Sequence, residues 1–275
     1  MQDFMEQFRS ARAAVQAKSP LIHSITSPIA VNDCANAVLA LGAKPIMAEH
    51  PLEVAKIARM ADALTVSLAN ITDARAQSIL IAGHEKSGVI DLVGINCSEL
   101  RMEIARTFIR DCHPSVIKGN ASEIRAIVGA DFDACGIDVG KKDAVSKNQP
   151  DSIARMANLM KPYAARTGAV ILSTGEVDLI AAPDGQTVYS IENGTPNLAK
   201  VTGTGCMLTC ILGVYLSVTD PLSAALLSAV TLGIAGETAD ASCGLGTYRV
   251  GLIDALSLLS DELISQRAKI SLTQF

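Results

Sequence analysis

Aromatic and charged side chains are both scarce in this sequence. Tryptophan is absent, aromatic residues make up 3% of the 275 positions, and charged residues make up 19%. The formal net charge is −5, and there is no basic run with stacking aromatics, so nothing in the sequence supports nucleic-acid binding. Hydrophobic residues reach 49%, a large share for one monomeric surface. We therefore expect other subunits to cover part of the apolar surface.

Cysteine pairs with metal-ligand spacing are also missing. The number of cysteines is seven, which is odd, and no two of them form a CxxC pair. This argues against both a disulfide framework and a zinc site. Most are expected to be small buried hydrophobic residues, with Cys206 set apart by its sequence context: Cys34, Cys97, Cys112, Cys135, Cys206, Cys210 and Cys243.

No long lipid-compatible run is present. Residues 1–20 predict a polar amphipathic helix without the apolar segment of a signal peptide. The longest apolar stretch, around 221–235, contains Ser, Thr and Gly and falls short of the ~18–20 residues that span a bilayer. We expect a soluble cytoplasmic protein with no membrane partner.

Short apolar runs alternate with helical segments, which is typical of a doubly wound α/β domain with a mostly parallel sheet. The expected strands are 21–25, 45–48, 64–67, 88–92, 115–117, 169–173, 177–182 and 187–191, the last two forming an antiparallel hairpin. The expected helices are 3–17, 29–41, 51–60, 72–86, 99–111, 121–128 and 151–167, followed by a helical C-terminal third at 205–218, 221–242 and 248–266. Residues 140–151 are expected to be an exposed loop. The whole chain, 1–275, is interpreted as a single domain.

The segment 200–209, KVTGTGCMLT, follows the hairpin and opens an apolar helix. Gly203 and Gly205 allow a tight turn that presents consecutive N–H groups, and Thr204 lies between them. With the helix N-terminus, these groups can hold negative charge, such as that on a phosphoryl group during transfer. A glycine turn required only for helix packing is the alternative interpretation.

This segment resembles the anion-hole motif of ribokinase-like kinases, in which an Asp usually stands at the position of Cys206. With a Cys at this position, the segment resembles that of the hydroxyethylthiazole kinase family in particular. The resemblance implies a three-layer α/β/α fold with Gly203, Thr204, Gly205 and Cys206 as the catalytic turn. A thiol at a helix N-terminus is expected to have a lowered pKa, so Cys206 could orient the substrate hydroxyl or accept its proton. The alternative is that Cys206 only fills space.

The resemblance covers nearly the whole chain. Residues 20–26 (PLIHSIT), 31–36 (VNDCAN) and 39–48 (LALGAKPIMA) are similar to the family's opening segments. It implies that Met47 contacts a thiazole ring, although Met47 taken alone fits an ordinary core position. Ser27 stands where the family carries Asn, and we place Ser27 and Asn32 with Gly203 on the substrate side.

Two acidic residues match the family's metal-binding positions. Residues 116–124 (VIKGNASEI) resemble its Arg-Gly-Asn-x-x-Glu-Ile signature, which makes Glu123 a Mg²⁺ ligand candidate. The same residues fit a helix capping box with Asn120 as N-cap, and both roles can hold together. Asp91 matches the Asp of the family's Asp-Pro-Val-Gly motif, and at the end of a buried strand it needs a partner.

The nucleotide side is inferred from the same resemblance. Residues 173–178 (STGEVD) match a family stretch that makes Thr174 and Gly175 ATP-binding candidates, although a plain strand-to-strand turn explains them too. Asn120 is assigned to the same side. Lys118 stands where an Arg is usual, so it keeps the charge but loses the bidentate fork.

The resemblance implies ATP- and Mg²⁺-dependent phosphorylation of 4-methyl-5-(2-hydroxyethyl)thiazole in thiamine biosynthesis, by a homotrimer with shared active sites. Two alternatives stay open. One is a ribokinase-like kinase for another heterocyclic alcohol of pyrimidine or pyridoxal type. The other is a non-catalytic ligand-binding relative, since departures from the family pattern at 92, 94–98 and 118 gather near the expected ligand pockets.

Overall fold

The computed structural model describes residues 2–135, 138–140 and 142–273. Its centre is a nine-stranded sheet in the order β11-β10-β9-β8-β5-β4-β3-β1-β2. The six strands from β2 to β8 run parallel, and β9, β10 and β11 are antiparallel to their neighbours. The strands are β1 (Leu21–Ile25), β2 (Lys44–Ile46), β3 (Ala63–Ser67), β4 (Val89–Asp91), β5 (Val116–Asn120), β8 (Val170–Thr174), β9 (Asp178–Ala181), β10 (Val188–Ile191) and β11 (Ile270–Leu272).

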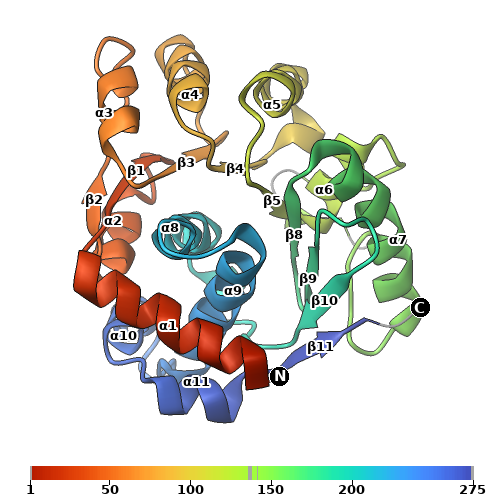
Figure 1. The fold of residues 1–275 in the computed structure, drawn as a ribbon. Coiled ribbons are helices and arrows are strands. Elements are labelled where there is room, and N and C mark those ends of the chain that lie inside the picture. The colour runs from red at the N-terminus through yellow and green to blue at the C-terminus, as the bar shows by residue number, and fades with distance from the viewer. Residues whose placement is uncertain (1, 136–137, 141, 274–275) are drawn as a thin grey trace.

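Helices cover both faces of this sheet, so the fold is the expected three-layer α/β/α arrangement (Figure 1). One face is covered by α3 (Val54–Met60), α4 (Asp73–Glu85), α5 (Glu99–Cys112), α6 (Ala121–Val128) and α7 (Pro150–Thr167). The other is covered by α1 (Gln2–Lys18), α2 (Val31–Ala40), α8 (Thr204–Leu216), α9 (Pro221–Thr238), α10 (Leu245–Ser257) and α11 (Asp261–Arg267). Short 3₁₀ turns lie at η1 (Ile95–Cys97) and η2 (Leu198–Lys200).

The two faces have separate hydrophobic cores because successive side chains of a strand point to opposite sides. In β5, Val116 packs in the core with α1, α2, α8 and α9, whereas Ile117 packs in the core with α3 to α7. Such continuously apolar strands are typical of parallel sheets buried on both faces.

The apolar helix α9 lies inside the protein. Asp220 caps it by accepting hydrogen bonds from the N–H groups of Leu222 and Ser223, both at 3.0 Å, and Pro221 occupies its first turn. By length and composition α9 could cross a membrane, but 78% of it is buried in the fold. It is the core helix behind β8 and β9.

Every strand expected from the sequence is present, and the 178–191 hairpin is antiparallel as predicted. The helix expected at 248–266 is wrong as one element: Ser260 accepts a hydrogen bond from Leu263 N and starts α11 as a separate helix. The edge strand β11 and the small hairpin β6 (Ala134–Cys135) and β7 (Asp138–Val139) were not expected.

The expected exposed loop at 140–151 is wrong in part. Asp143 and Val145 are buried, and Asp143 pairs with Arg125 at 3.1 Å. Residue 141 lies outside the described residues. Cys34, Cys112 and Cys210 are buried as predicted, and Cys206, which was set apart, is buried too. Cys97 and Cys243 are exposed, and the side chain of Cys135 lies outside what the structure describes.

Candidate active site

The glycine turn before α8 has the geometry that the sequence predicted. Gly203 is the residue before the helix and has φ +88°, in the region that favours glycine. A Cβ added at Gly203 would lie 2.7 Å from Ala30 Cβ, so a larger residue would collide with the loop before α2. The Thr204 hydroxyl donates to Leu198 O at 2.9 Å and fixes the turn from the other side.

The amides of this turn point away from protein acceptors. Met207 N donates to Gly203 O at 2.9 Å, which is the first bond of the helix ladder. Among the described residues, no protein oxygen accepts a hydrogen bond from the N–H groups of Thr204, Gly205 or Cys206. Such unpaired donors, with the positive end of the helix dipole, are suited to hold an anion, and we call this turn the candidate anion site.

A buried ion pair lies directly beneath the turn. Asp91 at the end of β4 and Lys118 on β5 are register partners, and Lys118 Nζ lies 3.0 Å from Asp91 Oδ2. The Thr209 hydroxyl, one turn into α8, donates to the same oxygen at 2.8 Å. Asp91 therefore has the partner that its burial required, and it connects the sheet to α8. Sequence reasoning missed Thr209, whose polar side chain in an otherwise apolar helix was the available signal.

The ammonium of Lys118 reaches the candidate anion site. A Cβ added at Gly205 would lie 3.7 Å from Lys118 Nζ, which places this charge next to the turn. Burial by itself would lower the pKa of Lys118, but the attraction of Asp91, and to a smaller extent of Glu123, raises it above its ordinary value. Lys118 is therefore a fixed positive charge beside the unpaired amides.

The expected low pKa of Cys206 is wrong. Burial, followed by repulsion from Asp91, raises the pKa of this thiol to about 11, and the nearby Lys118 only partly opposes the rise. The helix N-terminus alone therefore does not produce a thiolate at neutral pH. Cys206 is a neutral thiol in the free protein, able to donate a weak hydrogen bond.

Glu123 forms the predicted capping box. Its N–H donates to Asn120 Oδ1 at 2.9 Å, and its carboxylate accepts from Asn120 N at 2.8 Å. The other carboxylate oxygen accepts from Gly94 N at 2.8 Å. Burial and then the proximity of Asp91 raise the pKa of Glu123 to about 7, despite these two backbone donors. Two carboxyl groups that repel one another lie at one edge of the sheet.

These two carboxyl groups suit Mg²⁺, which proteins hold through one or two carboxylates and substrate phosphates. Asp91 Oδ1 is buried and has no hydrogen-bond partner among residues 2–135, 138–140 and 142–273, so an acceptor is available there. Within the described part of the chain, no cluster of three or more His, Cys, Asp or Glu side chains has metal-binding geometry. The donor set fits an ion shared with a nucleotide and does not form a closed protein cage.

The expected nucleotide residues adjoin this edge. Thr174 on β8 is the register partner of Asn120 on β5, and its hydroxyl donates to Gly119 O at 3.4 Å. The N–H of Gly175 is already taken by Asp178 Oδ1 at 2.9 Å. Asp178, which sequence reasoning did not assign, therefore shapes the 174–178 turn, and burial raises its pKa to about 7.

The expected substrate residues are less tightly grouped. Ser27 lies next to the turn through Ala30, whose N–H donates to Ser27 O at 3.0 Å, and the Ser27 hydroxyl donates to Asn70 Oδ1 at 2.8 Å. Met47 is partly buried against the core that contains α8. Asn32 is exposed on α2 and accepts a hydrogen bond from Asn36 at 3.1 Å, so the structure does not bring it together with the others.

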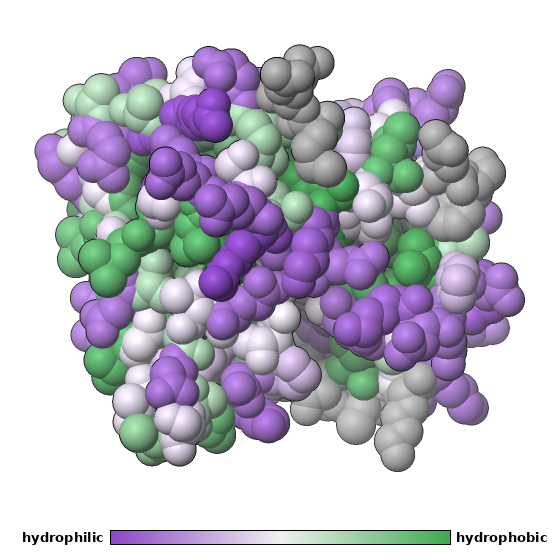
Figure 2. Space-filling view, turned by 90° about the horizontal axis from the view of Figure 1, so that it is seen from below, coloured by the Kyte–Doolittle hydropathy of each residue, from purple (hydrophilic) through white to green (hydrophobic). Residues whose placement is uncertain are grey.

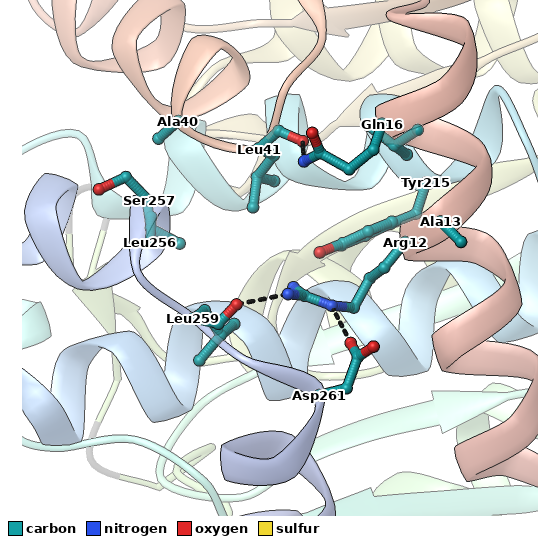
Figure 3. Close-up of a pocket in the computed structure, with 11 residues that line it drawn as sticks. Arg12, Ala13, Gln16, Ala40, Leu41, Tyr215, Leu256, Ser257, Leu259 and Asp261 are labelled. Carbon is teal, nitrogen blue, oxygen red and sulfur yellow. Dashed lines mark hydrogen bonds and ion pairs between the residues drawn. The ribbon is translucent and has the colours of Figure 1, made fainter.

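A separate pocket lies at the other end of α8 (Figure 3). It is a cavity of about 190 Å³ where the Tyr215 ring and the Arg12 side chain lie between α1 and α11, with Arg12 paired to Asp261 and to Leu259 O. None of the expected site residues lines it. The chemistry-bearing side chains are therefore concentrated at the N-terminal end of α8.

Comparison with solved structures identifies the fold. The chain superposes on pyridoxal kinase from Staphylococcus aureus in complex with ADP with a TM-score of 0.59 at 14% identity, covering 92% of this chain and 98% of that one. A ribokinase-like superfamily protein from Enterococcus faecalis gives a TM-score of 0.58 at 12% identity, covering 88% and 87%. The fold is that of the ribokinase-like kinases.

The family is more specific. The model of the hydroxyethylthiazole kinase family matches residues 13–262, so the chain belongs to this family. It is 46% identical to hydroxyethylthiazole kinase 2 of Clostridium botulinum strain 657 over 94% of this chain and 98% of the relative. Hydroxyethylthiazole kinase 1 of Methanosphaera stadtmanae is 36% identical over 97% and 98%. The hydroxyethylthiazole kinase structure from Pyrococcus horikoshii superposes with a TM-score of 0.85 at 28% identity and full coverage of both chains.

Proposed function

We propose that this protein transfers the γ-phosphoryl group of ATP to the hydroxyl of 4-methyl-5-(2-hydroxyethyl)thiazole, in thiamine biosynthesis or salvage. Family membership supports the reaction class and the substrate. The structural observation that carries the proposal is the set of unpaired N–H groups at Thr204, Gly205 and Cys206 beside the Lys118 ammonium. Fixed donors and a fixed cation aimed at developing negative charge are the main source of catalysis in phosphoryl transfer.

In this proposal the turn at 203–206 stabilises the phosphoryl group during transfer, and Lys118 neutralises part of its charge. Cys206 is a neutral thiol with a pKa of about 11, so it does not accept the proton of the substrate hydroxyl, and its role is to orient that hydroxyl. The hydroxyl keeps its proton until late in the transfer, when the proton passes to an oxygen of the transferred phosphoryl group, which is consistent with the loose transition state of phosphoryl transfer.

Asp91 and Glu123 would hold Mg²⁺, which neutralises charge on the ATP phosphates when it is bound. Asn120, Thr174 and Gly175 border the same edge and are proposed to contact the nucleotide, with Lys118 at its phosphates.

On the other side, Met47, Ser27 and Gly203 are proposed to contact the heterocycle. The side chain of Asn32 is exposed and hydrogen-bonded to Asn36. We propose that Asn32 contacts the substrate through a change in the first turn of α2 on binding.

We further propose that residues 1–275 act as one domain in a cytoplasmic homotrimer with shared active sites. Large apolar side chains are exposed near the substrate side, including Ile29 at 67% and Leu52 at 91%. On the face formed by α1, α10 and α11, hydrophilic residues cross the middle and hydrophobic ones gather in patches on either side (Figure 2). Sedimentation equilibrium tests the assembly, and a monomer at micromolar concentration would exclude it.

The test of the reaction is thiazole-dependent ADP release with Mg-ATP, measured beside pyridoxal and a hydroxymethylpyrimidine. We expect the thiazole alcohol to give the highest kcat/KM. Glu123→Gln should abolish most of the activity, whereas Cys243→Ala, at an exposed thiol, should leave it unchanged. A higher kcat/KM with pyridoxal or the pyrimidine would favour the kinase of another heterocycle, and no ADP release with any alcohol would favour a non-catalytic relative.

A further inference from the structure

Arg75 is a buried arginine that connects two loops on the substrate side. It lies on the first turn of α4 and is 3% exposed. Its Nη1 donates to the Glu49 carboxylate, and its Nη2 donates to Ala69 O at 3.3 Å. Glu49 follows β2 and Ala69 follows β3, so one planar guanidinium joins the loops that leave two strands of the sheet.

The first of these loops carries Met47. It is fixed at two further points: the Ser78 hydroxyl donates to Glu49 O at 2.8 Å, and His23 Nε2 lies 2.8 Å from Ala48 O. Because a carbonyl only accepts, His23 Nε2 carries the proton and donates. Three side chains from β1 and α4 thus hold the two residues that directly follow Met47.

The second loop leads to the phosphoryl turn. Asn70, next to Ala69, has φ +51°, a conformation that must be held by its surroundings. It accepts the Ser27 hydroxyl at 2.8 Å, Ser27 O accepts Ala30 N at 3.0 Å, and Ala30 borders Gly203. A continuous path of contacts therefore runs from Arg75 to the turn that would hold the phosphoryl group.

Stability alone is a poor explanation for this arginine. Among the described residues its only ion-pair partner is Glu49, whose side chain is 51% exposed, and Arg75 Nε is buried without a hydrogen-bond partner there. A buried charge with incomplete partners costs free energy, and replacing such groups by apolar ones is often neutral. The guanidinium instead fixes the position of the loop after β2 relative to the loop after β3.

We propose that Arg75 is a positioning residue that sets the heterocycle-binding loop of Met47 relative to Ser27 and the phosphoryl turn; this rests on the proposed function. Arg75 then acts on substrate affinity more than on the nucleotide side, because its contacts follow β2 and β3, and β4 separates these strands from β5 and β8, which carry Lys118 and Thr174.

The test compares Arg75→Met and Arg75→Lys with the wild type by steady-state kinetics. We expect Arg75→Met to raise KM for the thiazole alcohol about tenfold, with KM for ATP and kcat changed less than about threefold. Arg75→Lys keeps the charge but cannot bridge both acceptors, so it should recover only part of the loss. The matched control is Arg59→Met, which breaks the exposed Arg59–Glu85 pair at 2.6 Å between α3 and α4 and should change neither KM.

If Arg75→Met does not fold, Glu49→Gln removes the half-exposed partner and should shift the same KM in the same direction, about threefold. Hydrogen exchange of the wild type and the variants gives a readout independent of activity. In the Arg75 variants, the backbone amides of residues 47–50 and of residues 68–71 should both exchange faster than in the wild type. A wild type without thiazole-dependent turnover would refute the proposed function, while unchanged exchange in these two loops would refute the role of Arg75. Equal increases in both KM values would also overturn it.

Discussion

The phosphoryl side and the heterocycle side of the site are built differently. On the phosphoryl side, Asp91 and Lys118 are neighbours in the sheet, Thr209 reaches them from α8, and all three are buried. On the heterocycle side, Ser27, Met47 and Asn70 lie in loops. The Ser27–Asn70 hydrogen bond joins two of these loops, and Arg75 connects the loop of Met47 to that of Asn70 through Glu49 and Ala69 O. The first side is fixed by secondary structure, whereas the second depends on contacts that single substitutions can change. Substitutions on the phosphoryl side should therefore have the larger effects, and these effects should lower kcat more than they raise KM.

The largest effect is expected for Asp91→Asn. It leaves Lys118 buried without a counter-charge and removes a proposed metal ligand, so kcat should fall by about 10³-fold or more and the unfolding free energy by about 3 kcal/mol. Kinetics and urea denaturation measure the two losses. Asp111→Asn, at an exposed carboxylate paired with Arg110, is the control and should change neither. If kcat of Asp91→Asn stayed within tenfold of the wild-type value, the phosphoryl side would not be more sensitive to substitution than the heterocycle side.

Gly203→Ala should be next. The added Cβ would lie 2.7 Å from Ala30 Cβ at φ +88°, so the turn must shift and kcat should fall about 10²-fold. Gly129→Ala is a matched control, because Gly129 has φ +83° and no atom of the described residues lies within 4 Å of its Cβ position. Both variants should lose the ~1–2 kcal/mol of a left-handed alanine, and only Gly203→Ala should lose activity. Similar kinetics for the two would show that the turn is not part of the reaction.

The raised pKa of Glu123 predicts that the unfolding free energy depends on pH. Its pKa is about 7 in the folded protein and 4.5 as the ordinary value, so the protonated carboxyl contributes stability that is full below pH 4.5 and lost as the pH rises through 7. Relative to Glu123→Gln, the metal-free wild type should lose on the order of 2–3 kcal/mol of unfolding free energy between pH 5 and 8. Denaturation at a series of pH values measures this. Parallel stability curves would contradict the pKa.

Cys206 should react slowly with alkylating agents. Its pKa of about 11 leaves little thiolate at pH 8, and its side chain is largely buried. Mass spectrometry after iodoacetamide treatment should show Cys243 and Cys97, both exposed, modified at least about tenfold faster. Faster modification of Cys206 than of the exposed cysteines would show that its thiol has the lowered pKa expected from the sequence.

The smallest effect is expected on the heterocycle side. Met47→Ala should raise KM for the thiazole alcohol about fivefold with kcat and KM for ATP nearly unchanged, because it removes apolar contact made equally before and during the reaction. Met47→Leu keeps the volume and should lie close to the wild type. A large fall in kcat for Met47→Ala would mean that the two sides are not separable.

The same contrast explains what could be predicted from the sequence. The strands, the Gly203 turn, the Asn120–Glu123 capping box and the need of Asp91 for a partner follow from local patterns, because periodicity, glycine and capping residues act over a few positions. The roles of Thr209, Arg75 and Asn70 depend on pairs that are 118, 26 and 43 positions apart. No local pattern specifies such pairs.

The error at Cys206 has the same origin. Its helix position was visible in the sequence, but the carboxylate of Asp91 and the burial that raise its pKa come from the tertiary structure. The edge strand β11 was missed because only Ile270 of its three residues is buried, so no apolar run or alternation marks it, and its pairing with β10 joins distant parts of the chain.

The claim on which the rest depends is that the backbone amides at 203–206 hold a phosphoryl group during transfer. The most direct measurement is calorimetric titration of ADP, Mg²⁺, aluminium fluoride and the thiazole alcohol, a mimic of the transferring group, into the wild type and Gly203→Ala. We predict that the variant binds the mimic about 10²-fold more weakly while its affinity for ADP alone changes less than about threefold. Equal binding of the mimic by both proteins would contradict the claim.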